Sequence, residues 1–146
     1  MAEVIPIGSD HAGFELKERL VTELRARGYE PLDIGTHEPA SVDYPDYAHD
    51  VAGRVERHEA ARGVLLCGTG LGMAYAANRH HGVRAAVAWS PEVARLARSH
   101  NDANVLVLPA RFVSEGEGVD ILRAWLDTEF EGGRHSRRVA KIEEQG

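Results

Sequence analysis

The sequence predicts a single α/β domain over residues 1–146, with a Rossmann-like three-layer fold, a five-stranded parallel sheet and an additional C-terminal helix. Short apolar segments alternate along the chain with segments whose apolar residues recur at helical spacing. The apolar segments are hydrophobic on both faces, which is typical of parallel strands covered by helices on both sides. The chain has 146 residues, 43% hydrophobic and 27% charged, which is the usual size and composition of one domain.

The first half of the chain is predicted to hold two strands and two helices. An apolar strand over residues 3–9 precedes a helix over residues 13–28, in which leucine and valine recur at helical spacing until a glycine closes it. A second strand covers residues 30–34. The next helix begins near Pro45, because proline suits the first helical turn, and it reaches about residue 58.

The third and fourth strands follow, each with a helix behind it. The third strand covers residues 63–67, and a short helix runs from about residue 70 to residue 78. The fourth strand covers residues 84–89. The run Ser90-Pro91-Glu92 supplies an N-cap, a proline at the first helical position and an acid in the first turn, so a helix begins there. It is expected to end near Ser99.

The last part of the chain is predicted to hold one strand and two helices. The fifth strand covers residues 105–108. Ser114 and Glu117 have the spacing of a capping box, which precedes an amphipathic helix. A final, charged helix follows the pair Gly132-Gly133.

A parallel sheet of this kind predicts where a ligand binds. With five strands in this alternation, the expected arrangement places strand 1 beside strand 3, with the chain direction reversing between them. Ligands bind at such a switch point, beyond the carboxyl ends of the two strands. Asp10-His11 follows the first strand and Cys67-Gly68-Thr69 follows the third, so both are expected to face one crevice.

The run Gly68-Thr69-Gly70-Leu71-Gly72 joins a strand to a helix. Alternating glycines there let backbone N–H groups point outward at the positive end of the helix dipole, where they bind anionic oxygen. The run is not a Walker loop, since no Gly-Lys-Ser/Thr follows, and Met73 stands where a dinucleotide motif has its third glycine. The alternative is a tight turn that merely connects two elements.

Cys67 has two interpretations. A cysteine at the end of a strand is often a small core residue. Beside a helix N-terminus, however, the thiolate is favoured electrostatically, so the side chain can act as a base or a nucleophile. A phosphatase nucleophile of the Cys-x5-Arg type needs an arginine at position 73, which is methionine, and a proton-transferring base remains.

Two polar runs are candidates for the rest of the site. Asp10 is either a helix cap or a site residue, and His11 either an exposed loop residue or a site residue. His100-Asn101-Asp102 lies between the fourth helix and the fifth strand, at the edge of the sheet remote from Cys67. These residues are either a polar turn or, if catalytic, a contribution from a twofold-related partner that completes the site.

The C-terminal segment concentrates cations in an acidic chain. Arg134 and Arg138 share one helix face, a spacing that suits either a solvated surface or a grip on a phosphate group. The His80-His81 pair lacks the spacing of a metal site, as do the other histidines and the cysteine, so no metal is predicted.

Charge and cysteine content exclude several classes of partner. The net charge of −6 argues against nucleic acid. The longest apolar runs are too short to cross a bilayer, and the start of the chain lacks the parts of a signal peptide. One cysteine cannot form an internal disulfide, which suits a reducing compartment. We therefore expect a soluble, cytoplasmic protein without a membrane partner.

Taken together, these residues resemble the ribose-5-phosphate isomerase type B family, which also includes galactose-6-phosphate isomerase subunits. The match runs nearly end to end. It is carried by the motifs Ser9-Asp10-His11-Ala12-Gly13-Phe14, Asp43-Tyr44-Pro45, Cys67-Gly68-Thr69-Gly70-Leu71-Gly72, Ala76-Ala77-Asn78, His100-Asn101-Asp102-Ala103-Asn104 and Gly132-Gly133-Arg134-His135 with Arg138.

The resemblance implies a role for each candidate residue. Cys67 would be the base that moves a proton between C1 and C2, and His100 would assist ring opening; with Thr69 they are the candidate catalytic residues. Asp10 and Asn101 would hold sugar hydroxyls. The enediolate oxygens would be held by the turn Gly68, Thr69, Gly70, Leu71 and Gly72. Substrate, mainly its phosphate, would be contacted by His11, Arg111, Arg134 and Arg138.

The implied activity is the interconversion of D-ribose 5-phosphate and D-ribulose 5-phosphate through an enediolate, without a cofactor, in the non-oxidative pentose phosphate pathway. Two alternatives stay open. One is a six-carbon sugar phosphate, allose 6-phosphate or galactose 6-phosphate, as the substrate; the other is a non-catalytic domain that binds a phosphorylated metabolite. The resemblance also implies a homodimer or homotetramer with active sites shared between subunits.

Overall fold

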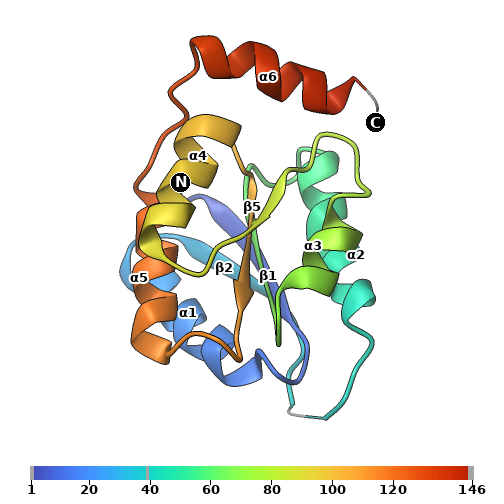
Figure 1. Cartoon of the computed structure of the whole chain (residues 1–146). Helices are drawn as coiled ribbons and strands as arrows, with labels where there is room; N and C mark the ends of the chain where they lie inside the picture. The colour runs from blue at the N-terminus through green and yellow to red at the C-terminus, as the bar shows by residue number, and fades with distance from the viewer. Residues whose placement is uncertain (1, 39, 145–146) are drawn as a thin grey trace.

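The computed structural model describes residues 2–38 and 40–144 and has the predicted α/β architecture (Figure 1). The strands are β1 (Val4–Ser9), β2 (Glu30–Gly35), β3 (Gly63–Cys67), β4 (Ala85–Val87) and β5 (Val105–Pro109). The helices are α1 (Phe14–Ala26), α2 (Tyr44–Glu56), α3 (Leu71–Ala77), α4 (Pro91–Asn101), α5 (Glu115–Leu126) and α6 (Arg134–Glu143). No helix among the described residues is long and apolar enough to cross a membrane.

All five strands are parallel and lie in the order β2-β1-β3-β5-β4. The predicted neighbours β1 and β3 are paired, with Ile7 opposite Val64. From β1 the chain first adds β2 on one side and then crosses to β3 on the other, which creates the switch point between β1 and β3. The fifth strand lies between β3 and β4, so β4 is an edge strand.

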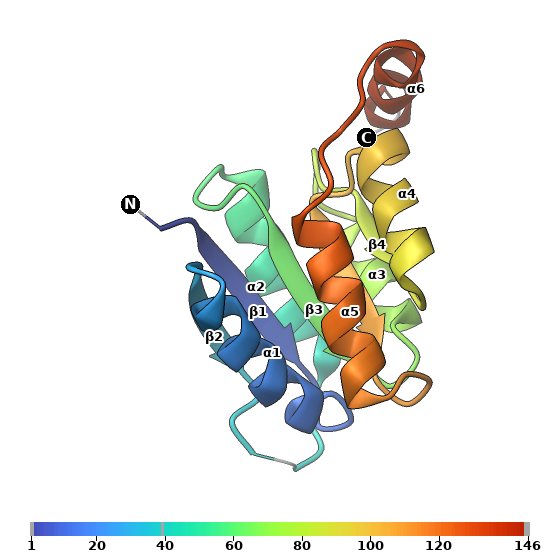
Figure 2. The same ribbon diagram turned by 90° about the vertical axis from the view of Figure 1, so that its left-hand side faces the viewer.

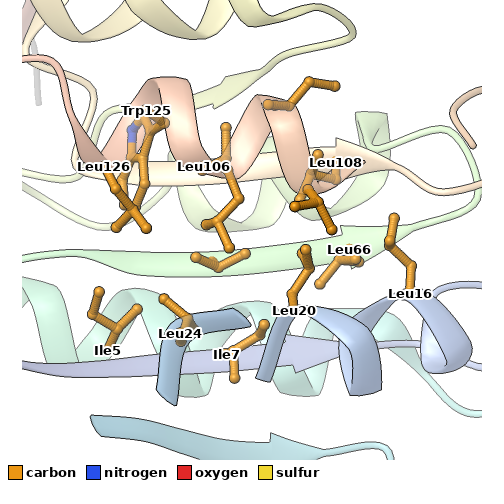
Figure 3. Packing of buried hydrophobic residues seen from close by; sticks show 14 of the residues in the cluster. Ile5, Ile7, Leu16, Leu20, Leu24, Leu66, Leu106, Leu108, Trp125 and Leu126 are labelled. Carbon is orange, nitrogen blue, oxygen red and sulfur yellow. The ribbon is translucent and has the colours of Figure 1, made fainter. Parts of the chain in front are cut away.

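Helices cover both faces of the sheet. Figures 1 and 2 show α1, α4 and α5 on one face and α2 and α3 on the other. Each face has its own buried apolar cluster, and Figure 3 shows the larger one. Ile5 and Ile7 of β1 belong to this larger cluster, and Trp125 of α5 is fully buried in it while its Nε1 donates to the Ala103 carbonyl at 3.1 Å.

The edge strand β4 is shorter than predicted and is partly exposed. The side chain of a neighbouring residue, Asn78, bonds to the backbone at its free edge. The Asn78 amide donates to the Ala85 carbonyl at 3.0 Å and accepts from the Ala85 N–H at 2.8 Å. The side chain thereby takes the place of a backbone partner at one residue of the free edge.

The helix α4 runs two residues further than predicted, so His100 and Asn101 form its last turn. The residue that caps its C-terminus is Asp102, which adopts φ +49°, a left-handed conformation that aspartate and asparagine tolerate better than most residues. Arg98 holds this end, because its Nη1 donates to Asp102 Oδ1 at 2.9 Å and to the Ala103 carbonyl at 3.0 Å.

The charged helix α6 lies beyond the amino ends of the strands (Figure 1). It follows Gly132 and Gly133, both with positive φ, which turn the chain away from α5. Its one buried residue is His135, and it packs against α4. The helix is therefore attached to the domain at few points.

Candidate active site

The structure brings the loop after β1 and the end of β3 together at the switch point. The Asp10 N–H donates to the Leu66 carbonyl at 3.2 Å, which continues the β1–β3 pairing one residue past the strand. Asp10 is 8% exposed, and its Oδ1 accepts from the Gly13 N–H at 3.0 Å, so the carboxylate is fixed at the start of α1. The Nδ1 atom of His11 is buried and has no hydrogen-bond partner among the described residues.

Cys67 ends β3 and is 5% exposed. Its carbonyl accepts from the Ala110 N–H at 2.9 Å, and the Gly68 carbonyl accepts from the Arg111 N–H at 3.0 Å. These bonds hold the loop after β5 against the glycine turn. The Arg111 side chain packs directly on Gly68, where an added Cβ would lie 3.0 Å from Nη1, so a cation stands beside the turn.

The glycine turn leads into the N-terminus of α3. Thr69 is exposed, and its Oγ1 accepts from the Leu71 N–H at 3.2 Å, which holds the turn in shape. Gly70 has φ +78°, and a Cβ there would lie 3.1 Å from Val87 Cγ1. The N–H groups in the first turn of a helix lack intrahelical partners, so this turn can receive an anionic oxygen.

The conformation of Gly70 predicts that Gly70→Ala lowers activity. A left-handed alanine costs about 1–2 kcal/mol, and the new Cβ presses on β4, so the turn shifts. Because the turn is the expected anion hole, we expect kcat/KM to fall at least about tenfold. Steady-state kinetics and a thermal melt measure the two effects.

Gly28→Ala is the matched control for this substitution. Gly28 has φ +88° and nothing within 4 Å of an added Cβ. An alanine there is destabilised by the same left-handed conformation, but far from the glycine turn. The control is expected to lower the melting temperature and leave kcat/KM unchanged. An equal loss of activity in both variants would mean that the effect of Gly70→Ala is only on stability.

Tyr44 contacts the glycine turn, although the sequence predicted no individual role for it. It is the first residue of α2, and its ring lies so close to Gly72 that an added Cβ there would be 2.5 Å from Cε1. The ring therefore packs directly against the glycine turn. The sequence feature that points to this residue is the Asp43-Tyr44-Pro45 run at the start of a helix.

His100 and Asn101 lie at the opposite edge of the sheet, as predicted. The segment that follows them is fixed there, because the Asn104 carbonyl accepts from the N–H of Gly63, the first residue of β3, at 2.9 Å. The length of β3, four steps of about 3.3 Å, separates this edge from Cys67 by about 13 Å. Within one chain, His100 and Cys67 therefore belong to different ends of the fold.

The end of α4 and the start of α6 form a second group of predicted site residues. The rings of His100 and His135 are stacked, with centroids 4.3 Å apart and an angle of 16° between the planes. Desolvation lowers the pKa of His135, and the nearby His100 and Arg134 lower it further, which favours a neutral ring. Arg134 and Arg138 are exposed on the same helix.

One group in the described part of the chain has the side chains of a metal site. His100, Glu131 and His135 place their ligand atoms within 4.8 Å of one another. The two rings are nearly parallel, however, so both cannot direct a nitrogen lone pair at one ion in this arrangement. The geometry is that of a stacked pair, and the absence of a metal requirement stays a prediction.

Comparisons with known proteins agree with these features. The model of the Ribose/Galactose Isomerase family matches residues 5–142. Ribose-5-phosphate isomerase B of Escherichia coli is 46% identical over 138 residues, which cover 94% of this chain and 93% of that protein.

Solved structures show the same fold. A ribose 5-phosphate isomerase from Thermotoga maritima is 52% identical, covers 99% of both chains and has a TM-score of 0.95. Ribose-5-phosphate isomerase B from Mycoplasma genitalium with bound ribulose-5-phosphate is 42% identical, with a TM-score of 0.95 over 99% of this chain and 97% of that one. The chain belongs to the ribose/galactose isomerase family.

Proposed function

We propose that this chain is a ribose-5-phosphate isomerase that interconverts D-ribose 5-phosphate and D-ribulose 5-phosphate. The observation that carries the proposal is the position of Cys67, which ends β3 beside Asp10 and opens directly into the glycine turn. The relatives named ribose-5-phosphate isomerase B and the structure with bound ribulose-5-phosphate support the choice of substrate.

Each part of the crevice has a task in this reaction. Cys67 removes a proton from one of the carbons C1 and C2 and returns it to the other, a transfer that needs a base held close to both. Negative charge then develops on the sugar oxygens, where the backbone N–H groups of the turn 68–72 other than that of Leu71 stabilise it. One such fixed donor contributes about 3 kcal/mol to lowering the barrier. Thr69 supports the turn through its bond to Leu71.

The remaining groups are supplied by a second copy of the chain. From this second copy, His100 assists ring opening, Asn101 holds a sugar hydroxyl, and Arg134 and Arg138 bind the phosphate. Arg111 and His11 of the chain that carries Cys67 contact the same phosphate. Support comes from the sheet. Cys67 lies at the carboxyl ends of the strands and His100 lies near their amino ends, so one chain cannot place both at one substrate. In the proposed twofold dimer, the amino ends of the strands of each subunit lie over the carboxyl ends of the strands of the other, and two such dimers form the tetramer.

Exposed apolar side chains support this assembly. They lie on α3, around β4 and α4, and after β5, and they are 43–72% exposed in the single chain: Leu71, Tyr75, Trp89, Leu96 and Phe112. Large apolar side chains gathered on neighbouring elements are typical of protein interfaces. We also propose a cytoplasmic location, because the one free thiol suits a reducing compartment.

The direct test is to assay the purified chain on ribose 5-phosphate, allose 6-phosphate and galactose 6-phosphate, and to measure binding separately by calorimetry. Ribose 5-phosphate is the expected substrate on the strength of the relatives, and one extra carbon typically changes kcat/KM by about tenfold or more. A higher kcat/KM on a six-carbon sugar phosphate would show that this sugar, and not ribose 5-phosphate, is the preferred substrate. Binding without turnover would identify a non-catalytic binding domain.

A further inference from the structure

Arg84 connects the two segments that the proposed function assigns to a partner's active site. It precedes β4, and its side chain is 17% exposed. Its Nε donates to the carbonyls of Asn101 and Asp102 at 3.2 Å and 3.0 Å, and its Nη2 donates to Asp102 Oδ2 at 3.3 Å. One face of the guanidinium group therefore holds the end of α4.

The other side of the same group holds α6. Arg84 Nη1 donates to Glu143 Oε1 at 2.7 Å, and the second oxygen of Glu143 accepts from the Gly82 N–H at 3.1 Å. Both oxygens of this carboxylate are thus bound by the segment that leads into β4. Charge-assisted hydrogen bonds are about twice as strong as bonds between neutral groups.

The position of α6 depends on this contact, because the helix has little else to hold it. At its first turn His135 stacks on His100, and at its last turn Glu143 meets Arg84, about 12 Å further along the axis. Between β4 and the end of α6 lies a cavity of about 460 Å³, whose lining includes Arg84, Ile142 and Glu143. The helix is therefore attached at its two ends and is not supported by a continuous core.

We infer that Arg84 is a positioning residue for the reaction, which fixes the His100–Asn101 turn and α6 relative to each other through Glu143. The inference rests on the proposed function, in which both segments serve the Cys67 of a second chain. Two segments that must reach one substrate together need a fixed separation, since a displacement of about 1 Å can cost about a hundredfold in rate. Arg84 itself contacts neither the substrate nor Cys67.

Kinetics of two variants and a control test this role. Glu143→Ala releases only α6, so KM is expected to rise about tenfold while kcat stays within about twofold. Arg84→Met also releases the end of α4, so KM rises at least as much and kcat falls. Unchanged KM in both variants would overturn the inference, and where Arg84→Met does not fold, Glu143→Ala decides.

Arg62→Met is the matched control. The Arg62 side chain is 16% exposed, pairs with Glu3 and donates to the Leu126 carbonyl, yet it holds no predicted site segment. Its loss is expected to lower the melting temperature and leave kcat and KM of the folded enzyme unchanged. A rise in KM equal to that of Arg84→Met would mean that any buried arginine has this effect.

Hybrid dimers separate this inference from the proposed function. In a hybrid of a Cys67→Ala chain with an Arg84→Met chain, one site combines an intact Cys67 with an intact Arg84 of the other subunit, so the wild-type KM is expected. A KM that stays high would show that Arg84 acts on its own chain's Cys67 site. Hybrids of Cys67→Ala with His100→Ala test the shared site itself. If they recover activity while the hybrids with Arg84→Met keep a raised KM, the shared site stands and only the role of Arg84 is wrong.

Discussion

Replacing Cys67 with alanine is expected to lower kcat for ribose 5-phosphate by about 10²–10⁴-fold, the range that a positioned acid or base contributes. The thiol ends β3 at the mouth of the glycine turn, and the substitution removes one sulfur atom from a site whose backbone bonds to Ala110 and Arg111 remain. Substrate affinity should therefore stay within a few-fold of wild type. Unchanged turnover in the variant would remove Cys67 from the mechanism.

Two controls sharpen this test. Cys67→Ser keeps the size of the side chain but offers a hydroxyl that is a far weaker acid, so its loss of kcat is expected to be nearly as large. Alkylation gives an independent measurement, because the chain has one cysteine and a single adduct in mass spectrometry reports on it. Bound substrate should protect the thiol, and modification without loss of activity would contradict the role of Cys67 as base.

Mixing two inactive variants is expected to restore activity. Cys67→Ala damages the carboxyl edge of its chain and His100→Ala damages the amino edge, so in a hybrid dimer one of the two sites receives both intact residues. Random pairing makes half of the dimers hybrid, and each hybrid has one working site, which predicts about a quarter of the wild-type activity. The two homodimers alone should be nearly inactive.

The matched control pairs Cys67→Ala with Thr69→Ala. Both residues lie on the same turn of the same chain, so every site in this hybrid carries one defect and no recovery is expected. Recovery with both pairs would point to exchange or repair and not to a shared site. A monomer with full activity, detected by light scattering during turnover, would contradict the shared site directly.

The fold was predictable to the extent that it depends on local patterns. Ser114 and Glu117 form the predicted capping box, with both bonds present at 2.8 Å and 3.1 Å. The pairing of β1 with β3 followed from the alternation of strands and helices. The position of β5 between β3 and β4 could not be predicted in this way, because the short Ala85–Val87 segment has no sequence feature that specifies its neighbouring strand.

The candidate site divides in the same way. Cys67, the glycine turn and Asp10 were recognisable because each directly follows a strand that the pattern identifies. The contacts of His100 with His135 and of Arg84 with Glu143 join residues 35 and 59 positions apart, and only the folded chain brings them together. The longer α4 escaped prediction because Asp102, an ordinary turn residue by type, ends the helix through its left-handed conformation.

The bonds between Asn78 and the edge strand restrict how copies of this protein can associate. A free strand edge is a template on which further chains can add without limit. At Ala85 both the donor and the acceptor that an incoming strand would use are already taken by one amide side chain. Growth by sheet extension is disfavoured there. The proposed twofold dimer, in contrast, uses side-chain contacts that close on themselves and do not continue into a fibre.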